Sequence, residues 1–97
     1  MSNLISAEKA RDSTIRNNPT LSVTEALRCL NSLIEGACLE GKCEVIMDIQ
    51  TWHVVTYGQG HEVKNVLRVN GYRFNEEKYV HILDGIEFKE KKVIISW

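Results

Sequence analysis

The sequence predicts an α+β fold with two layers, in which helices pack on one face of a small, mostly antiparallel sheet. Three features support this class: apolar residues recur at steps of three and four in the first half, β-branched runs follow, and glycines separate the segments. The last run, Val93–Trp97, suits a half-buried strand, so we expect the C-terminal strand to end in the core with Trp97. A length of 97 residues fits a single domain, residues 1–97.

The first segment, Ser6–Asn18, is expected to form a helix that is poorly amphipathic. Ser6 suits the N-cap, and Pro19 ends the helix because the residue before a proline avoids the α conformation. A helix this polar gains little by packing on its own core. We therefore expect residues 1–18 either to lie loosely on the surface or to act as an oligomerisation arm. The side chains that a second copy would bury are Ala7, Ala10 and Ile15.

The second segment carries the strongest helical pattern. Ser22-Val23-Thr24-Glu25 has the form of a capping box, in which the serine serves the N3 amide and the glutamate reaches back. A continuous apolar stripe predicts a long helix over Val23–Glu40, and Gly41 supplies the left-handed residue that ends it. Leu30 and Leu33 lie on this stripe, so we expect both in the core.

The middle of the chain changes period. Cys43–Ile49 alternates with a period of two and predicts a strand with one covered face. Trp52–Tyr57 has β propensity but no evident partner, so strand, helix and loop stay open for it. Gly58-Gln59-Gly60 breaks the chain, and His61–Asn70 predicts a short helix.

The last quarter is expected to be an antiparallel meander. Asp84-Gly85 is a favoured two-residue hairpin turn. Lys89–Lys92 is expected to form a polar turn before the final strand. The predicted strands are Tyr72–Phe74, Tyr79–Leu83, Ile86–Phe88 and Val93–Trp97.

Charge and cysteine content restrict the function classes. Twelve lysines and arginines face 13 acidic residues, so nucleic acid is an unlikely partner for a chain of net charge -1. No apolar stretch approaches the ~20 residues that span a bilayer, which argues against a membrane partner. Three cysteines without a secretion signal predict reduced thiols in a cytosolic protein. Cys29 and Cys38 are expected to pack as small hydrophobes on the long helix.

No catalytic or metal-binding motif stands out. Cys38, Cys43, His53 and His61 have the chemistry of zinc ligands, but a helix end and a strand start hold the two thiols poorly for a shared ion. The chain has no glycine-flanked nucleophile and no recognisable triad order. We therefore predict a non-enzymatic protein with no catalytic residues, no metal and no cofactor.

One aromatic and imidazole cluster is the best candidate site for a ligand or partner. It lies around the two glycines ahead of the short helix, where aromatic faces and imidazoles could stack a base and hold a phosphate. The simpler interpretation is that its aromatic residues close the edge of the sheet. The cluster consists of Trp52, His53, Tyr57 and His61.

Four stretches carry a resemblance to a known group of proteins. They are Ser6-Ala7-Glu8-Lys9-Ala10-Arg11, the helix end near Gly41-Lys42, Leu67-Arg68-Val69-Asn70-Gly71-Tyr72-Arg73-Phe74 and Ile94-Ile95-Ser96-Trp97. In this layout the chain resembles small, mostly uncharacterised accessory proteins encoded by T4-like tailed bacteriophages. It departs from that layout between Gln50 and Gly60, where an aromatic, glycine-broken stretch lengthens the connection.

The resemblance implies a setting rather than a mechanism. Such proteins are made in the cytoplasm of the bacterial host, and many are accessory or host-takeover factors that work by binding. We therefore expect a homo-oligomeric binding protein whose partner is a host or phage protein. Two alternatives stay open: a small-molecule sponge that sequesters a signalling nucleotide of host defence, and a virion-associated structural protein.

Overall fold

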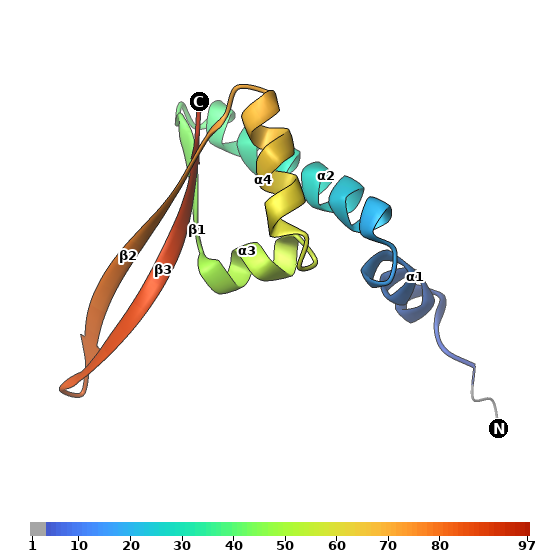
Figure 1. Ribbon diagram of the computed structural model, residues 1–97, viewed down its shortest axis with the longest axis horizontal. Helices are drawn as coiled ribbons and strands as arrows, with labels where there is room; N and C mark the ends of the chain where they lie inside the picture. Colours follow the sequence, from blue (N-terminus) through green and yellow to red (C-terminus); the bar gives the residue numbers. More distant parts are fainter. Residues whose placement is uncertain (1–3) are drawn as a thin grey trace.

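The computed structural model describes residues 4–97, and in this range the chain forms four helices and a three-stranded sheet (Figure 1). The order of elements is α1, α2, β1, α3, α4, β2 and β3, with all helices ahead of the final hairpin. Their bounds are α1 Ala7–Arg16, α2 Pro19–Leu39, β1 Glu44–Asp48, α3 Ile49–Val55, α4 Gly60–Val69, β2 Arg73–Leu83 and β3 Ile86–Ser96.

The sheet is antiparallel throughout and has the strand order β1-β3-β2. β3 pairs with β2 over its whole length, from Arg73 opposite Ser96 to Leu83 opposite Ile86. β1 is shorter and pairs only with the C-terminal half of β3, ending with Asp48 opposite Lys92. These contacts between helices and an antiparallel sheet confirm the predicted α+β class.

The core lies between the helices and the end of the hairpin away from its turn, where the helices cover one face of the sheet (Figure 1). α2 contributes Ala26 and Leu30, four residues apart, which places both on the helix face that meets the sheet. Val93 and Ile95 of β3 are fully buried, and the alternation of strand side chains puts them on the same sheet face. The other members of the buried cluster are Met47, Trp52, Val63, Leu67 and Phe74.

The predicted capping box is wrong, because α2 begins four residues earlier, at Pro19 and not at Val23. Asn18 is the N-cap, with its side chain accepting from the Leu21 amide at 3.2 Å, and Pro19 is the first helical residue. Proline is favoured at that position because its missing N–H is not needed there. Ser22 therefore lies inside the helix, fully buried, and donates to the Ile15 carbonyl at 2.5 Å.

Most of the segment that the sequence left open is helical, because residues 52–55 form the second half of α3, and a turn follows at residues 56 and 57. Asp48, the last residue of β1, caps α3 by accepting from the Thr51 amide at 2.7 Å. That hydrogen bond favours the carboxylate and lowers the pKa of Asp48 below its ordinary value. Trp52 is 4% exposed, so its burial from a helical turn outweighs the β propensity of the segment. The strand predicted to run to Ile49 accordingly stops one residue earlier.

The hairpin corrects a second prediction. β3 runs unbroken from Ile86 to Ser96, so Lys89–Lys92 is strand and not a polar turn, and β2 likewise extends from Arg73 to Leu83. The Asp84-Gly85 turn is confirmed, because both residues have positive φ, 52° and 78°.

Several predicted core positions lie at the surface. Trp97 is 39% exposed and packs edge-on against Tyr72 with ring centroids 6.0 Å apart. Strand β3 therefore contributes to the core, but Trp97, the residue that follows it, does not. Leu33 is also exposed, at 42%. Cys29 and Cys38 are exposed free thiols and do not pack as core hydrophobes.

The outline of the protein is extended. Its radius of gyration is 16.4 Å, whereas a compact chain of this length has about 13 Å. Figure 1 shows the reason: the turn end of the β2–β3 hairpin projects from the helices on one side, and α1 lies at the other end of the molecule.

Candidate interaction surface

The turn end of the hairpin has neither a helix nor a third strand over it within residues 4–97 (Figure 1). We call this part, residues 78–91, the distal hairpin. β1 pairs only with residues 92–96 of β3, so the outer edge of β3 is open beyond Lys92. Every residue of the distal hairpin is exposed except Tyr79, which is half-buried. A two-stranded ribbon of this kind is marginally stable in water by itself.

Apolar side chains are concentrated on this uncovered ribbon. Ile82 is 69% exposed, and Leu83 and Ile86 beside the turn are 61% and 60% exposed. The exposed large hydrophobic residues of the distal hairpin are Val80, Ile82, Leu83, Ile86 and Phe88. Two of these side chains lie on one face of the ribbon and three on the other, and exposed apolar surface beyond scattered single residues is characteristic of interaction sites.

The side of the hairpin that points away from the helices has its polar groups paired. The Tyr79 hydroxyl donates to the Glu90 carboxylate at 2.7 Å, and this hydrogen bond raises the pKa of Tyr79 above its ordinary value. His81 stacks on Phe88 with ring centroids 5.4 Å apart. Closer to the base, the Lys92 ammonium lies 3.4 Å from the Glu77 carboxylate. We call this side the paired face.

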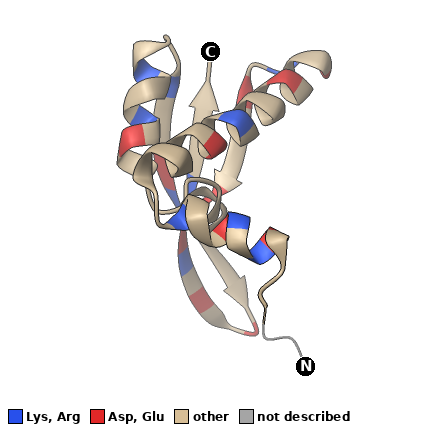
Figure 2. Ribbon diagram, turned by 90° about the vertical axis from the view of Figure 1, so that its right-hand side faces the viewer, with Lys and Arg blue, Asp and Glu red and all other residues tan. Residues whose placement is uncertain are grey.

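The opposite side, which continues the helix-covered face of the sheet, carries three lysines. Register and strand alternation place Lys78, Lys89 and Lys91 there, with Val80 and Ile82 between them. None of these lysines forms an ion pair with any residue in 4–97. Figure 2 shows that both signs of charge occur along the hairpin. We call this side the lysine face.

The structure brings three of the four residues of the predicted cluster together. Trp52, His53 and His61 line a shallow hollow of about 290 Å³ at the base of the hairpin. The Trp52 ring packs against Phe74 with centroids 5.0 Å apart, and it is almost fully buried. The Trp52 ring therefore belongs to the core, and little of it is exposed in the hollow.

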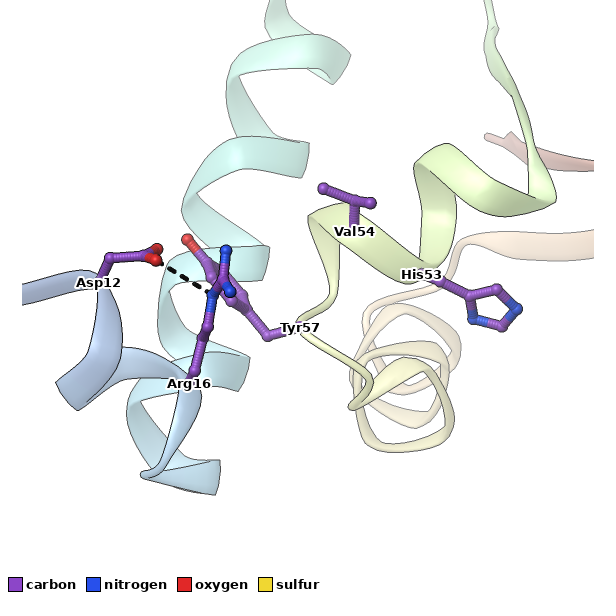
Figure 3. A pocket seen from close by; sticks show the side chains of 5 residues that line it. All are labelled: Asp12, Arg16, His53, Val54 and Tyr57. Atoms are coloured by element: carbon purple, nitrogen blue, oxygen red, sulfur yellow. Dashed lines mark ion pairs between the residues drawn. The ribbon is translucent and has the colours of Figure 1, made fainter. Parts of the chain in front are cut away.

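Tyr57, the fourth residue, faces another hollow. It lines a space of about 500 Å³ between α1 and α3 together with Asp12, Arg16, Val54 and His53, although the His53 ring points away from the other four side chains (Figure 3). Asp12 and Arg16 form an ion pair of 3.1 Å within α1. The four residues thus do not surround one ligand-sized volume, and their role in binding stays a prediction.

The residues of the predicted oligomerisation arm lie on α1, which contacts α2 of the same chain. Ala7 is exposed, whereas Ala10 and Ile15 are half-buried. The Ile15 carbonyl accepts the hydrogen bond from Ser22, which ties the end of α1 to α2. Exchange of this helix between copies stays a prediction.

Metal-binding clusters and membrane-spanning helices are both absent from the described part of the chain. Within residues 4–97, no group of three or more His, Cys, Asp or Glu side chains is arranged to hold a metal ion. None of the helices in the same range combines the length and the apolar character that a bilayer span requires.

From the sequence, a protein-recognition surface is expected on the exposed sheet face and the first helix, but the distal hairpin is missed because a predicted turn that does not exist divides the strands. The available signal was the run Tyr79–Leu83 followed after the Asp84-Gly85 turn by Ile86 and Phe88, since apolar residues there occupy both strand faces.

Fold and surface together define the class: a small α+β domain with a projecting β-ribbon. Comparison with known proteins adds no relative, since no family model, no curated protein and no solved structure matches the chain.

Proposed function

We propose that this protein acts without catalysis, by binding another protein through the distal hairpin. The observation that carries the proposal is the presence of five large apolar side chains, 40% to 69% exposed, on the two faces of a ribbon that no other described element covers. Burying such side chains in a partner is favourable in proportion to the area removed from water. The same contact would hold in place a ribbon that is marginal by itself.

The resemblance to phage accessory proteins supplies the setting of the proposal. In that setting the partner is a host or phage protein in the bacterial cytoplasm, and binding to it changes what the partner does. The virion-associated role fits the same surface, with a structural phage protein as the partner.

The nucleotide alternative has less support. It needs an aromatic face that is free to stack on a base, and the Trp52 ring is 4% exposed. A nucleotide bound by Trp52, His53 and His61 would have to lie in the shallow hollow at the hairpin base. Native mass spectrometry of protein purified gently from bacterial cells would detect such a ligand as mass released on denaturation.

Site-specific photo-crosslinking in bacterial cells tests the main proposal. A benzophenone amino acid replaces Ile82 in the distal hairpin, and in a control protein it replaces Leu39, which is 90% exposed at the end of α2. We expect a discrete protein adduct from position 82 and not from position 39. Mass spectrometry then identifies the partner, and the purified pair is used to measure its dissociation constant.

The decisive variant is Ile82→Ser combined with Phe88→Ser, which removes an apolar side chain from each face of the ribbon. We expect binding of the purified partner to fall while the unfolding midpoint stays close to that of the wild type, because both positions lie outside the core. Equal adducts from positions 82 and 39, or unchanged binding by the double variant, would overturn the proposal.

A further inference from the structure

We infer that the lysine face binds an acidic amphipathic segment of the partner protein, an inference that rests on the protein-binding function proposed above. The segment would place aliphatic side chains against Val80 and Ile82, and carboxylates beside the three lysines. The arrangement of charge on this face favours such a segment. Lys78 lies directly opposite Lys91 in the strand register, and Lys89 is opposite Val80 on the same face.

Like charges directly opposite each other destabilise a pair of strands. On the lysine face that unfavourable pair has no carboxylate within ion-pairing distance in the described chain. An acidic partner would supply the missing counter-charge and would turn the Lys78–Lys91 repulsion into two attractive contacts. The lysine face is therefore electrostatically incomplete in the free protein.

On the paired face of the same ribbon, by contrast, the charged side chains have partners of opposite charge or hydrogen-bonding partners. There Lys92 has Glu77 at 3.4 Å, and Glu90 accepts from Tyr79 at 2.7 Å. The two faces are built from the same two strands and differ by one residue in register. The lack of partners is thus specific to one face and is not a general property of the hairpin.

Two glutamates bound the lysine face and limit the length of the partner segment. Glu76 precedes Lys78 on the same side of β2, and Glu87 lies opposite Ile82 near the turn. Carboxylates of a bound segment would be repelled at both ends and attracted between them. A partner should therefore carry its acidic residues in the middle of the bound stretch.

A protein segment fits this face better than a nucleic acid. Single-stranded nucleic acids are held by aromatic stacking as well as by charge, but the aromatic residues Tyr79 and Phe88 lie on the paired face. The lysine face offers Val80 and Ile82 instead, which suit aliphatic side chains. The chain also has a formal net charge of -1, whereas phosphate-backbone binders usually carry a basic excess.

Fluorescence anisotropy with the full chain tests the inference. The probes are a labelled amphipathic helical peptide with leucine and glutamate on one side, the same peptide with glutamine in place of glutamate, and a labelled DNA single strand. We expect the glutamate peptide to bind about tenfold more tightly than the glutamine peptide, with the difference shrinking as salt increases. The DNA strand should bind more weakly than the glutamate peptide.

Two triple variants locate the effect. Lys78→Gln with Lys89→Gln and Lys91→Gln should abolish the preference for glutamate. A control with the same loss of charge, Lys9→Gln with Lys42→Gln and Lys92→Gln, should keep it. The last of these matters most, because Lys92 adjoins Lys91 on β3 but lies on the paired face.

The outcomes separate this inference from the proposed function. Equal binding of both peptides, a preference that survives in the lysine-face variant, or tighter binding of DNA would overturn the acidic partner. If the adduct at position 82 nevertheless forms, protein binding by the hairpin stands. If that adduct is absent as well, both proposals fall.

Discussion

The two halves of one hairpin meet the solvent in different ways. In the half near the helices, Val93 and Ile95 are fully buried, and β1 covers the edge of β3. In the distal hairpin, Ile82 and Ile86 are at least 60% exposed although the strand pairing is the same. Backbone pairing alone therefore does not make a β-ribbon part of a core, because the stability of the covered half comes from side-chain burial.

The strongest way to break this comparison is to truncate one apolar side chain in each half of β3. Ile95→Ala should lower the free energy of unfolding by about 2–5 kcal/mol, because it leaves a cavity in the core. Phe88→Ala should lower it by less than about 1 kcal/mol, because the ring is 40% exposed. Urea unfolding measures both variants. Similar losses would show that the distal hairpin is covered in the free protein.

A second prediction concerns the covered end of the hairpin, where Gly60 begins α4 beside Trp52. A Cβ atom at Gly60 would lie 2.7 Å from Trp52 Nε1, so the indole must shift. Gly60→Ala should therefore destabilise the protein by about 1–3 kcal/mol. Thermal and urea unfolding measure the change.

Gly36 in α2 provides the matched control for this substitution. A Cβ atom there meets nothing within 4 Å, so Gly36→Ala should stabilise the helix by about 0.5–1 kcal/mol. The same chemical change is thus expected to have opposite signs at the two glycines. Stabilisation by Gly60→Ala would mean that the indole is not fixed in the core.

A third prediction sharpens the comparison at the tip of the hairpin. Gly85 has φ of 78°, and an alanine forced into a left-handed conformation costs about 1–2 kcal/mol. Because few side chains couple the tip to the core, Gly85→Ala should speed amide hydrogen exchange in residues 78–91 and leave the β1 amides unchanged. A matching increase in β1 would instead show that the hairpin unfolds as one unit.

The smallest expected effect is the titration of Tyr79. Its hydrogen bond to Glu90 raises the pKa of the phenol, so folding favours the neutral form. The associated stability is present below the ordinary tyrosine pKa of 10.0 and is lost as the pH rises through the higher value of the folded protein. Absorbance titration should show a late-ionising tyrosine.

Two variants identify that phenol. Tyr79→Phe should remove the late-ionising group, and Glu90→Gln should move its pKa back toward the ordinary value. A titration that neither variant alters would mean that the hydrogen bond does not form in solution.

Local signals in the sequence predicted much of the fold. The left-handed Gly41 ends α2 as expected, Gly71 follows α4 in the same conformation, and Asp84-Gly85 makes the predicted turn. These features depend on a few adjacent residues. The start of α2 could have been predicted from Asn18 and Pro19. As interpreted from the sequence, these residues only end the first helix, although they also begin the second.

The failures arose where structure depends on distant residues. Lys89–Lys92 has the composition of a turn and becomes strand because β2 pairs with it along its full length. Trp52 has strand propensity and becomes helical because Phe74 and the helices bury it. The candidate surface escaped detection for the same reason, since the exposure of Val80 and Ile82 depends on how far β1 and the helices reach.

Asp48 determines where the free ribbon begins. It is the last paired residue of β1, opposite Lys92, and it also caps α3, so the chain leaves the sheet at that point. The position of this cap therefore determines the length of the hairpin that β1 leaves unpaired. Inserting two residues before Asp48 would extend β1 by about 6–7 Å along β3 and shorten the free ribbon by the same length. The length of ribbon left free in the protein would then be set by residues that lie outside the ribbon itself.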